Sequence, residues 1–192
     1  STIISVLKEH QLDNGRGLAR QSILKHQHEK DSGRTSSITH HYLKNEKCNL
    51  TFIDLAGHEK YFKTTIHGVN TCSIDYAILM IGSNMGVSKM TIEHLTLILI
   101  LKLPFIVVFS KIDLCPQSVF KQSFKDLQKV LAKYKIHKNL IEINSEQLAL
   151  NNLDFAKDKS IPYFKISNIS GHNIDLFKNY LLNIKLLNDW KL

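Results

Sequence analysis

The feature that most restricts the fold of this chain is a mostly apolar run that ends in an acidic residue, a short turn and a glycine. Residues 50–53 are followed by Asp54, Leu55, Ala56, Gly57 and His58. Such a run predicts a buried strand, and open α/β sheets bind their ligands at the carboxyl ends of the strands. A carboxylate there can hold hydrated Mg²⁺, while a glycine lets a backbone N–H approach a terminal phosphate because no side chain stands in the way.

A second apolar run, residues 104–109, leads into Ser110, Lys111, Ile112 and Asp113. Asp113 can recognise guanine, because a carboxylate accepts hydrogen bonds from both the ring N–H and the exocyclic amino group of that base, and adenine has no such pair of donors. The aliphatic stem of Lys111 can lie along the base. The pattern favours a guanine nucleotide over an adenine nucleotide, although a lysine and an aspartate after a strand are also ordinary loop residues.

A polar segment precedes both of these strands. Residues 31–37 are small and polar and lack an apolar period, which predicts a mobile loop. Three of its hydroxyl groups, on Ser32, Thr35 and Ser36, have the chemistry to bind a cation. The spacing to the following strand favours Thr35.

A fourth segment follows the apolar residues 161–164. Ser167, Asn168 and Ile169 stand near the expected end of that strand, and right-handed crossovers would bring them to the same sheet edge as the other three segments. Together the four segments resemble the DxxGH, NKxD, RGIT and SAL elements of translation-factor GTPases. Ser110 departs from that pattern, because the second element has an Asn whose amide braces the loop.

The chain as a whole resembles the GTP-binding protein 1/2 family, a branch of the translation-factor GTPases related to elongation factor Tu. The stretches that carry this resemblance are residues 12–20, 25–29, 57–61, 82–86, 90–95 and 110–116. The resemblance implies an α/β fold of the P-loop NTPase G-domain type, with a doubly wound, mostly parallel sheet and helices on both faces. It also implies a Mg²⁺-dependent molecular switch that binds GTP and GDP and hydrolyses GTP.

The same resemblance assigns roles to individual residues. His58 would orient the water that attacks the γ-phosphate, either as a base or only as a hydrogen-bonding group. The Mg²⁺ ligands would be Ser1, Thr35 and Asp54. The residues expected to contact the nucleotide are Ser1, Thr2, Asp54, Leu55, Ala56, Gly57, His58, Ser110, Lys111, Ile112, Asp113, Ser167, Asn168 and Ile169.

The phosphate-binding motif GxxxxGK[ST] is missing from this sequence. Ser1 and Thr2 resemble its last position, but the strand, the glycines and the lysine that would precede them are absent. We therefore expect residues 1–192 to be a single GTPase domain that is truncated at its phosphate-binding loop, lacks the β-barrel domains that follow in the family, and has a gap in the centre of its sheet.

Two other functions stay open at this point. One is a remnant of the domain that has lost nucleotide binding and serves as a protein or RNA interaction module. The other is an enzyme that uses ATP or another nucleotide on the same scaffold, and Lys111 with Asp113 argues against it.

The composition agrees with one cytoplasmic domain. A chain of 192 residues with 43% hydrophobic and 22% charged residues can bury a core. The net charge of +8 is compatible with docking on the ribosome, tRNA or other RNA, although a solvated helix face explains the lysines of residues 120–138 better. No apolar stretch is long enough to span a bilayer, and the three cysteines lack CxxC spacing, so we expect a monomer with free thiols and no membrane partner.

Periodicity predicts four helices and five strands. The helices are expected at residues 1–9, 91–101, 119–135 and 173–186, and the strands at residues 49–54, 76–82, 105–109, 140–144 and 163–166. In the third helix one apolar face should be core: Phe120, Phe124, Leu127, Val130, Leu131 and Tyr134. Residues 138–160 are expected to hold an insert with strand-like character.

Overall fold

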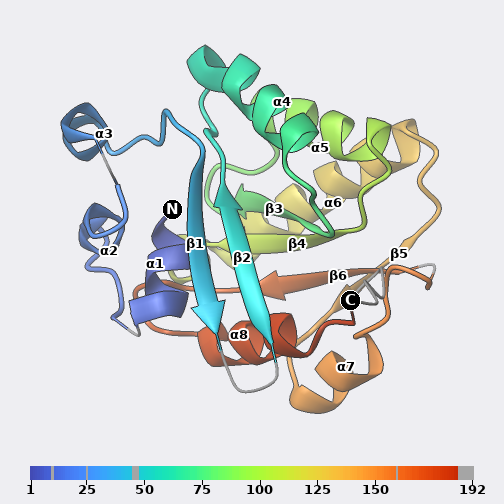
Figure 1. Ribbon diagram of the computed structural model, residues 1–192. Coiled ribbons are helices and arrows are strands. Elements are labelled where there is room, and N and C mark those ends of the chain that lie inside the picture. The colour runs from blue at the N-terminus through green and yellow to red at the C-terminus, as the bar shows by residue number, and fades with distance from the viewer. Residues whose placement is uncertain (10, 25, 45–47, 159, 186–192) are drawn as a thin grey trace.

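The computed structural model describes residues 1–9, 11–24, 26–44, 48–158 and 160–185. Figure 1 shows strands in the middle of the molecule and helices on either side of them. The strands are β1 (Thr39–Lys44), β2 (Asn49–Asp54), β3 (Ala77–Gly82), β4 (Phe105–Ser110), β5 (Asn139–Glu142) and β6 (Ser160–Lys165). The helices are α1 (Thr2–Glu9), α2 (Leu18–Gln21), α3 (Gln27–Ser32), α4 (Phe62–Thr71), α5 (Lys89–Ile100), α6 (Gln117–Lys133), α7 (Glu146–Asn151) and α8 (Ile174–Asn183), with 3₁₀ turns η1 (Glu59–Tyr61) and η2 (Ile112–Leu114).

The strands form two sheets. β1 and β2 pair antiparallel, with Thr39 opposite Asp54. The larger sheet is parallel in the order β3-β4-β6-β5, and in Figure 1 the strands of the smaller sheet run across it. Neither β2 nor β3 has a second partner strand among the residues that the structure describes. That a strand ahead of Ser1 would lie between the two sheets stays a prediction.

The core follows from the alternation of side chains along β4, which is apolar on both faces. Ile106 and Val108 belong to one cluster, which α1 and α8 cover, and Phe105, Val107 and Phe109 belong to a second cluster, which α5 and α6 cover. Successive side chains of a strand point to opposite faces, so a fully apolar strand requires helices on both. The predicted fold class is therefore confirmed.

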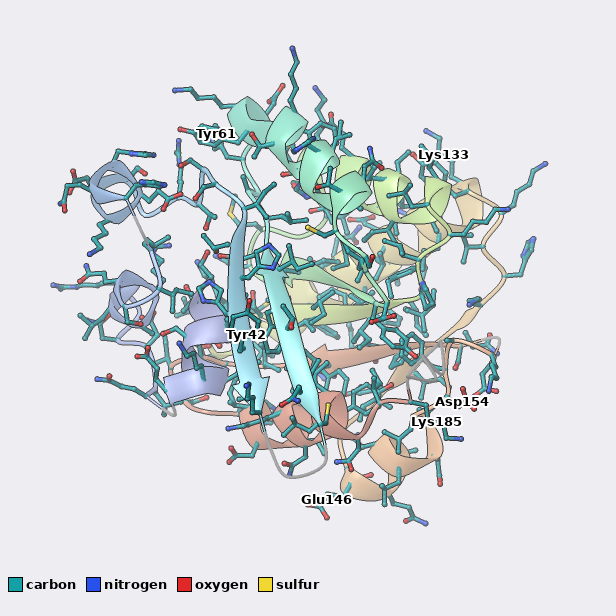
Figure 2. All side chains as sticks on the ribbon, in the orientation of Figure 1. Tyr42, Tyr61, Lys133, Glu146, Asp154 and Lys185 are labelled. Carbon is teal, nitrogen blue, oxygen red and sulfur yellow. The ribbon has the colours of Figure 1, made fainter. Side chains whose placement is uncertain are left out.

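The predicted helices correspond to α1, α5, α6 and α8, and the predicted strands to β2 through β6, with small differences at their ends. The last helix ends at Asn183 rather than at residue 186, which lies outside the described residues. The insert expected within residues 138–160 contains both β5 and α7. In Figure 2, Lys185 after α8 lies near Asp154 after α7, and their side chains form an ion pair with Nζ 3.2 Å from Oδ2.

Some elements were not predicted, and one prediction was wrong. Periodicity misses β1, α2, α3, α4 and α7. The loop predicted for residues 31–37 begins too early, because α3 continues to Ser32 and ends at Gly33, whose φ of 64° is left-handed. The start of α3 is stabilised by a capping box between His26 and Glu29, which the pattern of apolar residues cannot reveal. No helix among the described residues has the length and apolar character needed to cross a bilayer.

Candidate functional site

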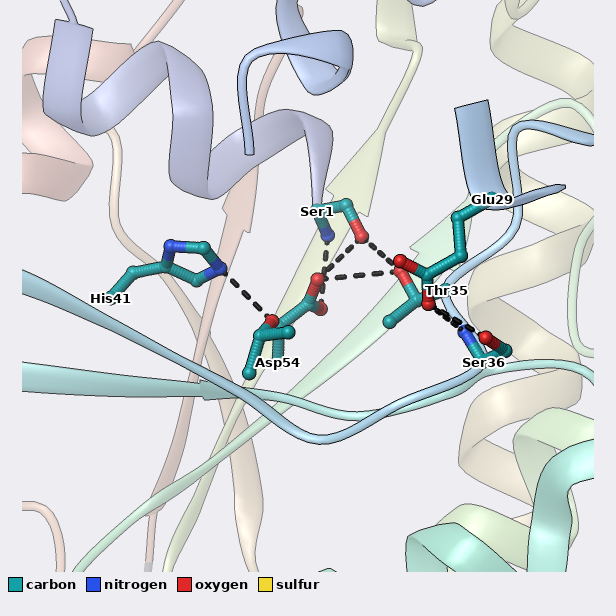
Figure 3. Close-up of polar contacts among 7 residues, drawn as sticks. Ser1, Glu29, Thr35, Ser36, His41 and Asp54 are labelled. Carbon is teal, nitrogen blue, oxygen red and sulfur yellow. Dashed lines mark hydrogen bonds and ion pairs between the residues drawn. The ribbon is translucent and has the colours of Figure 1, made fainter. Parts of the chain in front are cut away.

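Asp54, at the end of β2, is the centre of a cluster of oxygen atoms (Figure 3). Its side chain accepts hydrogen bonds at Oδ2 from Ser1 Oγ at 2.5 Å and from Thr35 Oγ1 at 3.4 Å. The hydroxyl groups of Ser1 and Thr35 are hydrogen-bonded to each other. The amino group of Ser1 forms an ion pair with Asp54 Oδ1 at 3.1 Å. The structure thus brings together three residues that are 34 and 53 positions apart in the sequence.

This set of atoms fits a magnesium ion. Mg²⁺ prefers hard oxygen ligands and binds through one or two carboxylates, with water and substrate phosphates in its other positions. Asp54 supplies one carboxylate, and Ser1 and Thr35 supply two hydroxyl oxygens within hydrogen-bonding distance of it. In the part of the chain that the structure describes, no group of three or more His, Cys, Asp and Glu side chains is placed to hold a metal ion.

The turn after β2 leaves open space where the sequence predicts a phosphate. A Cβ atom on Gly57 would meet no atom within 4 Å. Ala56 is buried, and its carbonyl accepts a hydrogen bond from Thr65 Oγ1 at 2.5 Å, so α4 fixes the start of the turn. Leu55 is half-buried. The turn therefore has a fixed base and an open end at Gly57.

His58 caps the 3₁₀ turn that follows. Its Nδ1 accepts a hydrogen bond from the backbone N–H of Lys60 at 3.2 Å. A neutral imidazole with an accepting Nδ1 carries its proton on Nε2, which is then a donor. The ring is half-buried and lies 6.4 Å from the Tyr61 ring, centroid to centroid. The local structure thus presents Nε2–H as the available hydrogen-bonding group of His58.

The loops after β4 and β6 form a second part of the candidate site. Asp113 lies in η2 and is exposed, as is Lys111, whose φ of 58° is left-handed. Ile112 N donates to Ile166 O at 3.3 Å, and Ile166 N donates to Phe109 O at 2.9 Å, so the two loops are joined through their backbones. These backbone hydrogen bonds fix the position of the turn, while the side chains of Lys111 and Asp113 stay exposed.

The loop after β6 is held by its own hydroxyl group. Ser167 is buried, and its Oγ accepts hydrogen bonds from the backbone N–H groups of Ile169 at 3.2 Å and Ser170 at 3.1 Å. The side-chain Oδ1 of Asn168 is buried and has no hydrogen-bond partner among the described residues. Ser110, at the end of β4, donates from Oγ to Ile81 O at 3.4 Å. The structure brings the predicted residues of these two loops together at one edge of the larger sheet.

The two parts lie on one side of the molecule. In Figure 1, β3 and β6 point towards the side on which the amino terminus lies. The carboxyl ends of parallel strands meet at one sheet edge, and Ser83 N after β3 donates to Ser110 O at 2.9 Å. Thr2 begins α1 next to Ser1. The geometry therefore agrees with the sequence-based placement of the site, while the role of each residue stays a prediction.

Sequence reasoning missed a loop that packs against the segment after β6. Asp13 N donates to Asn168 O at 2.8 Å. The Asp13 carboxylate accepts from the N–H groups of Gly15, Gly17 and Ala19 at 3.2, 3.2 and 2.9 Å. Asp and Asn before Gly are typical of such turns, so the DNG triplet was a signal for the turn. Its contact with the β6 loop has no local signal, because it joins residues far apart in the chain.

Sequence reasoning also missed Glu29, which has 0% exposure. Its carboxylate accepts hydrogen bonds from the residues that follow Thr35 (Figure 3). Burial raises the pKa of this carboxyl, but hydrogen bonds from the backbone and hydroxyl of Ser36, the backbone of His26 and the hydroxyl of Ser37 outweigh burial and hold the pKa at about 2. Glu29 is therefore an ionised group within the protein at neutral pH.

The fold and the strand-end residues define a GTP-binding domain of the translation-factor class. Residues 1–187 match the family described as "Elongation factor Tu GTP binding domain", so the chain belongs to this family. Among curated proteins it is similar to GTP-binding protein 1 of Xenopus laevis, with 39% identity over 94% of this chain and 32% of that protein. It is also similar to GTP-binding protein 2 of Homo sapiens, with 40% identity over 94% of this chain and 34% of that protein. The resemblance to the GTP-binding protein 1/2 family is thus confirmed, and the chain spans about a third of the length of these relatives.

Solved structures agree on the fold. A bacterial selenocysteine-specific elongation factor, EF-Sec, superposes with a TM-score of 0.66 at 22% identity, over 95% of this chain and 26% of that one. Elongation factor SelB from Methanococcus maripaludis, solved in complex with the GTP analogue GppNHp, gives a TM-score of 0.57 at 19% identity, over 82% of this chain and 31% of that one. At these identities the likeness concerns the fold alone.

Proposed function

We propose that this chain binds GTP and GDP with Mg²⁺ and hydrolyses the γ-phosphate of GTP, as the nucleotide domain of a translation-factor-like GTPase. The observation that carries the proposal is the convergence of Ser1, Thr35 and Asp54 at the end of β2. These residues would hold the ion: Asp54 would supply a negatively charged oxygen ligand, and Ser1 and Thr35 would each supply a hydroxyl oxygen. Bound Mg²⁺ would neutralise phosphate charge during phosphoryl transfer.

Guanine recognition is assigned to the second part of the site. Asp113 would accept hydrogen bonds from the ring N–H and the amino group of guanine, and the stem of Lys111 would lie along the base. In the loop of Ser167, Asn168 and Ile169, a backbone N–H would donate to the base oxygen; Asn168 N is the candidate, because Ser167 N donates to His172 O and Ile169 N to Ser167 Oγ. Ser110 reaches Ile81 O only at 3.4 Å, so it braces the loop less well than the usual Asn amide, and base affinity should be lower than in relatives that carry the Asn.

His58 is assigned the orientation of the attacking water rather than proton abstraction. Its Nδ1 already accepts from Lys60 N, so the neutral ring offers Nε2–H, a donor, to the water. Gly57 leaves the γ-phosphate room beside it. Hydrolysis is then slow until a large partner orders His58, because the ring is held by one weak hydrogen bond in a short turn.

The remaining assignments follow the family. The segment GxxxxGK, which the 192 residues do not contain, would bind the phosphates ahead of Ser1 and add its strand between β2 and β3, and β-barrel domains would follow. The ribosome, tRNA or other RNA is the proposed partner of a cytoplasmic monomer. The exposed lysines at four-residue spacing on α6, of which Lys133 projects outward in Figure 2, support an RNA partner: Lys121, Lys125, Lys129 and Lys133.

The test is binding of a fluorescent GDP to two proteins, the 192-residue chain and the same chain extended by the residues that its gene encodes ahead of Ser1. ATP serves as competitor. Binding by the extended protein that GTP but not ATP displaces would support the proposal. Binding by neither protein would overturn it and favour an interaction module that has lost nucleotide binding.

A further inference from the structure

Glu29 holds the loop on the carboxyl side of Thr35 through four hydrogen bonds to one oxygen atom. Its Oε1 accepts from Ser36 N and Ser36 Oγ, both at 2.7 Å, and from Ser37 N and Ser37 Oγ at 3.2 and 3.1 Å. Its other oxygen, Oε2, accepts from His26 N at 3.3 Å. A buried carboxylate is costly unless such donors surround it, so the contact is specific to an ionised group at this position.

A second side chain of α3 contacts the same residue after Thr35. His28 Nε2 lies 2.8 Å from Ser36 Oγ, which gives the helix a second contact with the residue after Thr35. Gly33 ends the helix with a left-handed φ of 64°, and a Cβ there would lie 2.3 Å from an Arg20 guanidinium nitrogen. The chain on the amino side of Thr35 is therefore restricted at Gly33, where a side chain would be strained, and the chain on its carboxyl side is held by Glu29.

The geometry points to Glu29 as a positioning residue for Thr35, one that holds the 36–37 backbone so that the Thr35 hydroxyl faces Ser1 and Asp54. Glu29 does not touch the oxygen cluster itself and acts only through the loop. The inference rests on the proposed function, since Thr35 is a metal ligand only if the site binds a metal nucleotide. A segment of this kind orders around a triphosphate and its metal and is released in the diphosphate state.

Glu29→Gln is the decisive substitution, because it keeps the size of the side chain but removes its charge and replaces one of the two carboxylate oxygens, whose partners are donors, by an NH₂ group. Asp31→Asn is the matched control. Asp31 lies on the same helix and accepts from Gln27 Nε2 at 2.9 Å, within that helix. Ser37→Ala is a milder second variant, which removes one of the four donors while Glu29 stays ionised.

The first measurement is the Mg²⁺ concentration for half-maximal binding of a non-hydrolysable GTP analogue and of GDP, with the extended protein of the preceding subsection. We expect Glu29→Gln to raise this concentration about five- to tenfold for the GTP analogue, which corresponds to the net loss of roughly one ordinary hydrogen bond, and less than twofold for GDP. Ser37→Ala should shift it in the same direction by a smaller factor, and Asp31→Asn should leave it unchanged. If Glu29 only stabilised the fold, its substitution would change the Mg²⁺ concentration for half-maximal binding by the same factor for both nucleotides.

The second measurement needs no nucleotide. Arg34 is exposed and precedes Thr35, so the rate of trypsin cleavage after Arg34, followed by mass spectrometry, reports how firmly the loop is held. Glu29→Gln should accelerate this cleavage at least fivefold relative to Asp31→Asn. Equal cleavage in all variants, or an equal change in Mg²⁺ dependence for both nucleotides, would overturn the positioning role. If no variant or parent binds a nucleotide, the proposed function fails, and the cleavage rates still decide whether Glu29 holds the loop.

Discussion

Asp54 and Asp113 are both carboxylates that follow strands of the central sheets, yet their surroundings differ. Asp54 is 8% exposed and is contacted by side chains from two distant segments. Asp113 is exposed, and the 3₁₀ turn that carries it is joined to the β6 loop by backbone hydrogen bonds. The proposed metal end, formed by Ser1, Thr35 and Asp54, is thus organised by long-range side-chain contacts. The proposed base end, at the loops after β4 and β6, is organised by backbone hydrogen bonds, and Lys111 and Asp113 are exposed there. Substitutions at the proposed metal end should disturb the whole cluster, and substitutions at the proposed base end should alter the affinity or selectivity for the base while Mg²⁺ dependence is preserved.

Asp54→Asn should have the largest effect, because it removes the single charge of the metal end. We expect loss of Mg²⁺-dependent GDP binding by at least about a hundredfold, since a metal-ligating carboxylate has no substitute in this cluster. Titration of the extended protein with Mg²⁺ and fluorescent GDP measures this. Unchanged Mg²⁺ dependence would show that Asp54 is not a metal ligand.

Asp113→Asn should have the second-largest effect and should change the selectivity for the base rather than abolish nucleotide binding. An amide in place of the carboxylate complements the edge of xanthine, so we expect about a hundredfold weaker GDP binding and tighter XDP binding, with Mg²⁺ dependence preserved. Competition between GDP and XDP for the fluorescent nucleotide measures this. Asp158→Asn, an exposed aspartate on another loop, is the control. If the binding of GDP and XDP were weakened equally, Asp113 would support the fold and would not recognise the base.

The pH dependence of stability tests how Glu29 holds the loop next to the proposed metal end. The pKa of Glu29 is about 2 in the folded protein against 4.5 for an ordinary glutamate, so its contribution is complete above about pH 4.5 and is lost as the pH falls towards 2. By pH 3 the parent should have lost about 2 kcal/mol of unfolding free energy from this group, and Glu29→Gln should lack that loss. Urea unfolding of the two proteins between pH 7 and pH 3 tests this, and parallel curves would contradict it.

Ser110→Asn should have the smallest effect. An Asn amide can brace the base loop where Ser110 Oγ makes only a 3.4 Å contact with Ile81 O. We expect GDP affinity to rise about three- to fivefold, the value of one modest hydrogen bond, with no change in selectivity. Isothermal titration with GDP in saturating Mg²⁺ would detect this. A decrease would indicate that the loop is already adapted to serine.

The strand ends were predictable from the sequence because each combines an apolar run with a polar residue at its end. β1 was not, although its side chains alternate strictly between buried and exposed. Its buried positions are Thr39, His41 and Leu43, so two of the three inward residues are polar and the alternation does not appear as a hydrophobic pattern. Burial of those polar residues is a tertiary effect, and periodicity cannot report it.

The residues that position the site were harder to predict than the residues of the site. Glu29 lies in a polar stretch, and its partners are seven and eight residues away, which matches neither a helical nor a strand period. The backbone of Asp13 is hydrogen-bonded to that of Asn168, and most of the chain separates these two residues in the sequence. Motifs therefore indicated the side chains that would contact a ligand, while the supporting contacts depend on how distant segments meet.

The hydrogen bonds on the two sides of the loop at residues 35–37 have a consequence for movement within the domain. The Thr35 hydroxyl contacts Asp54 at the end of β2, and Glu29 of α3 holds the backbone of the next two residues. Three consecutive residues therefore connect α3 to β2. A shift of either element would be transmitted to the other through this short segment.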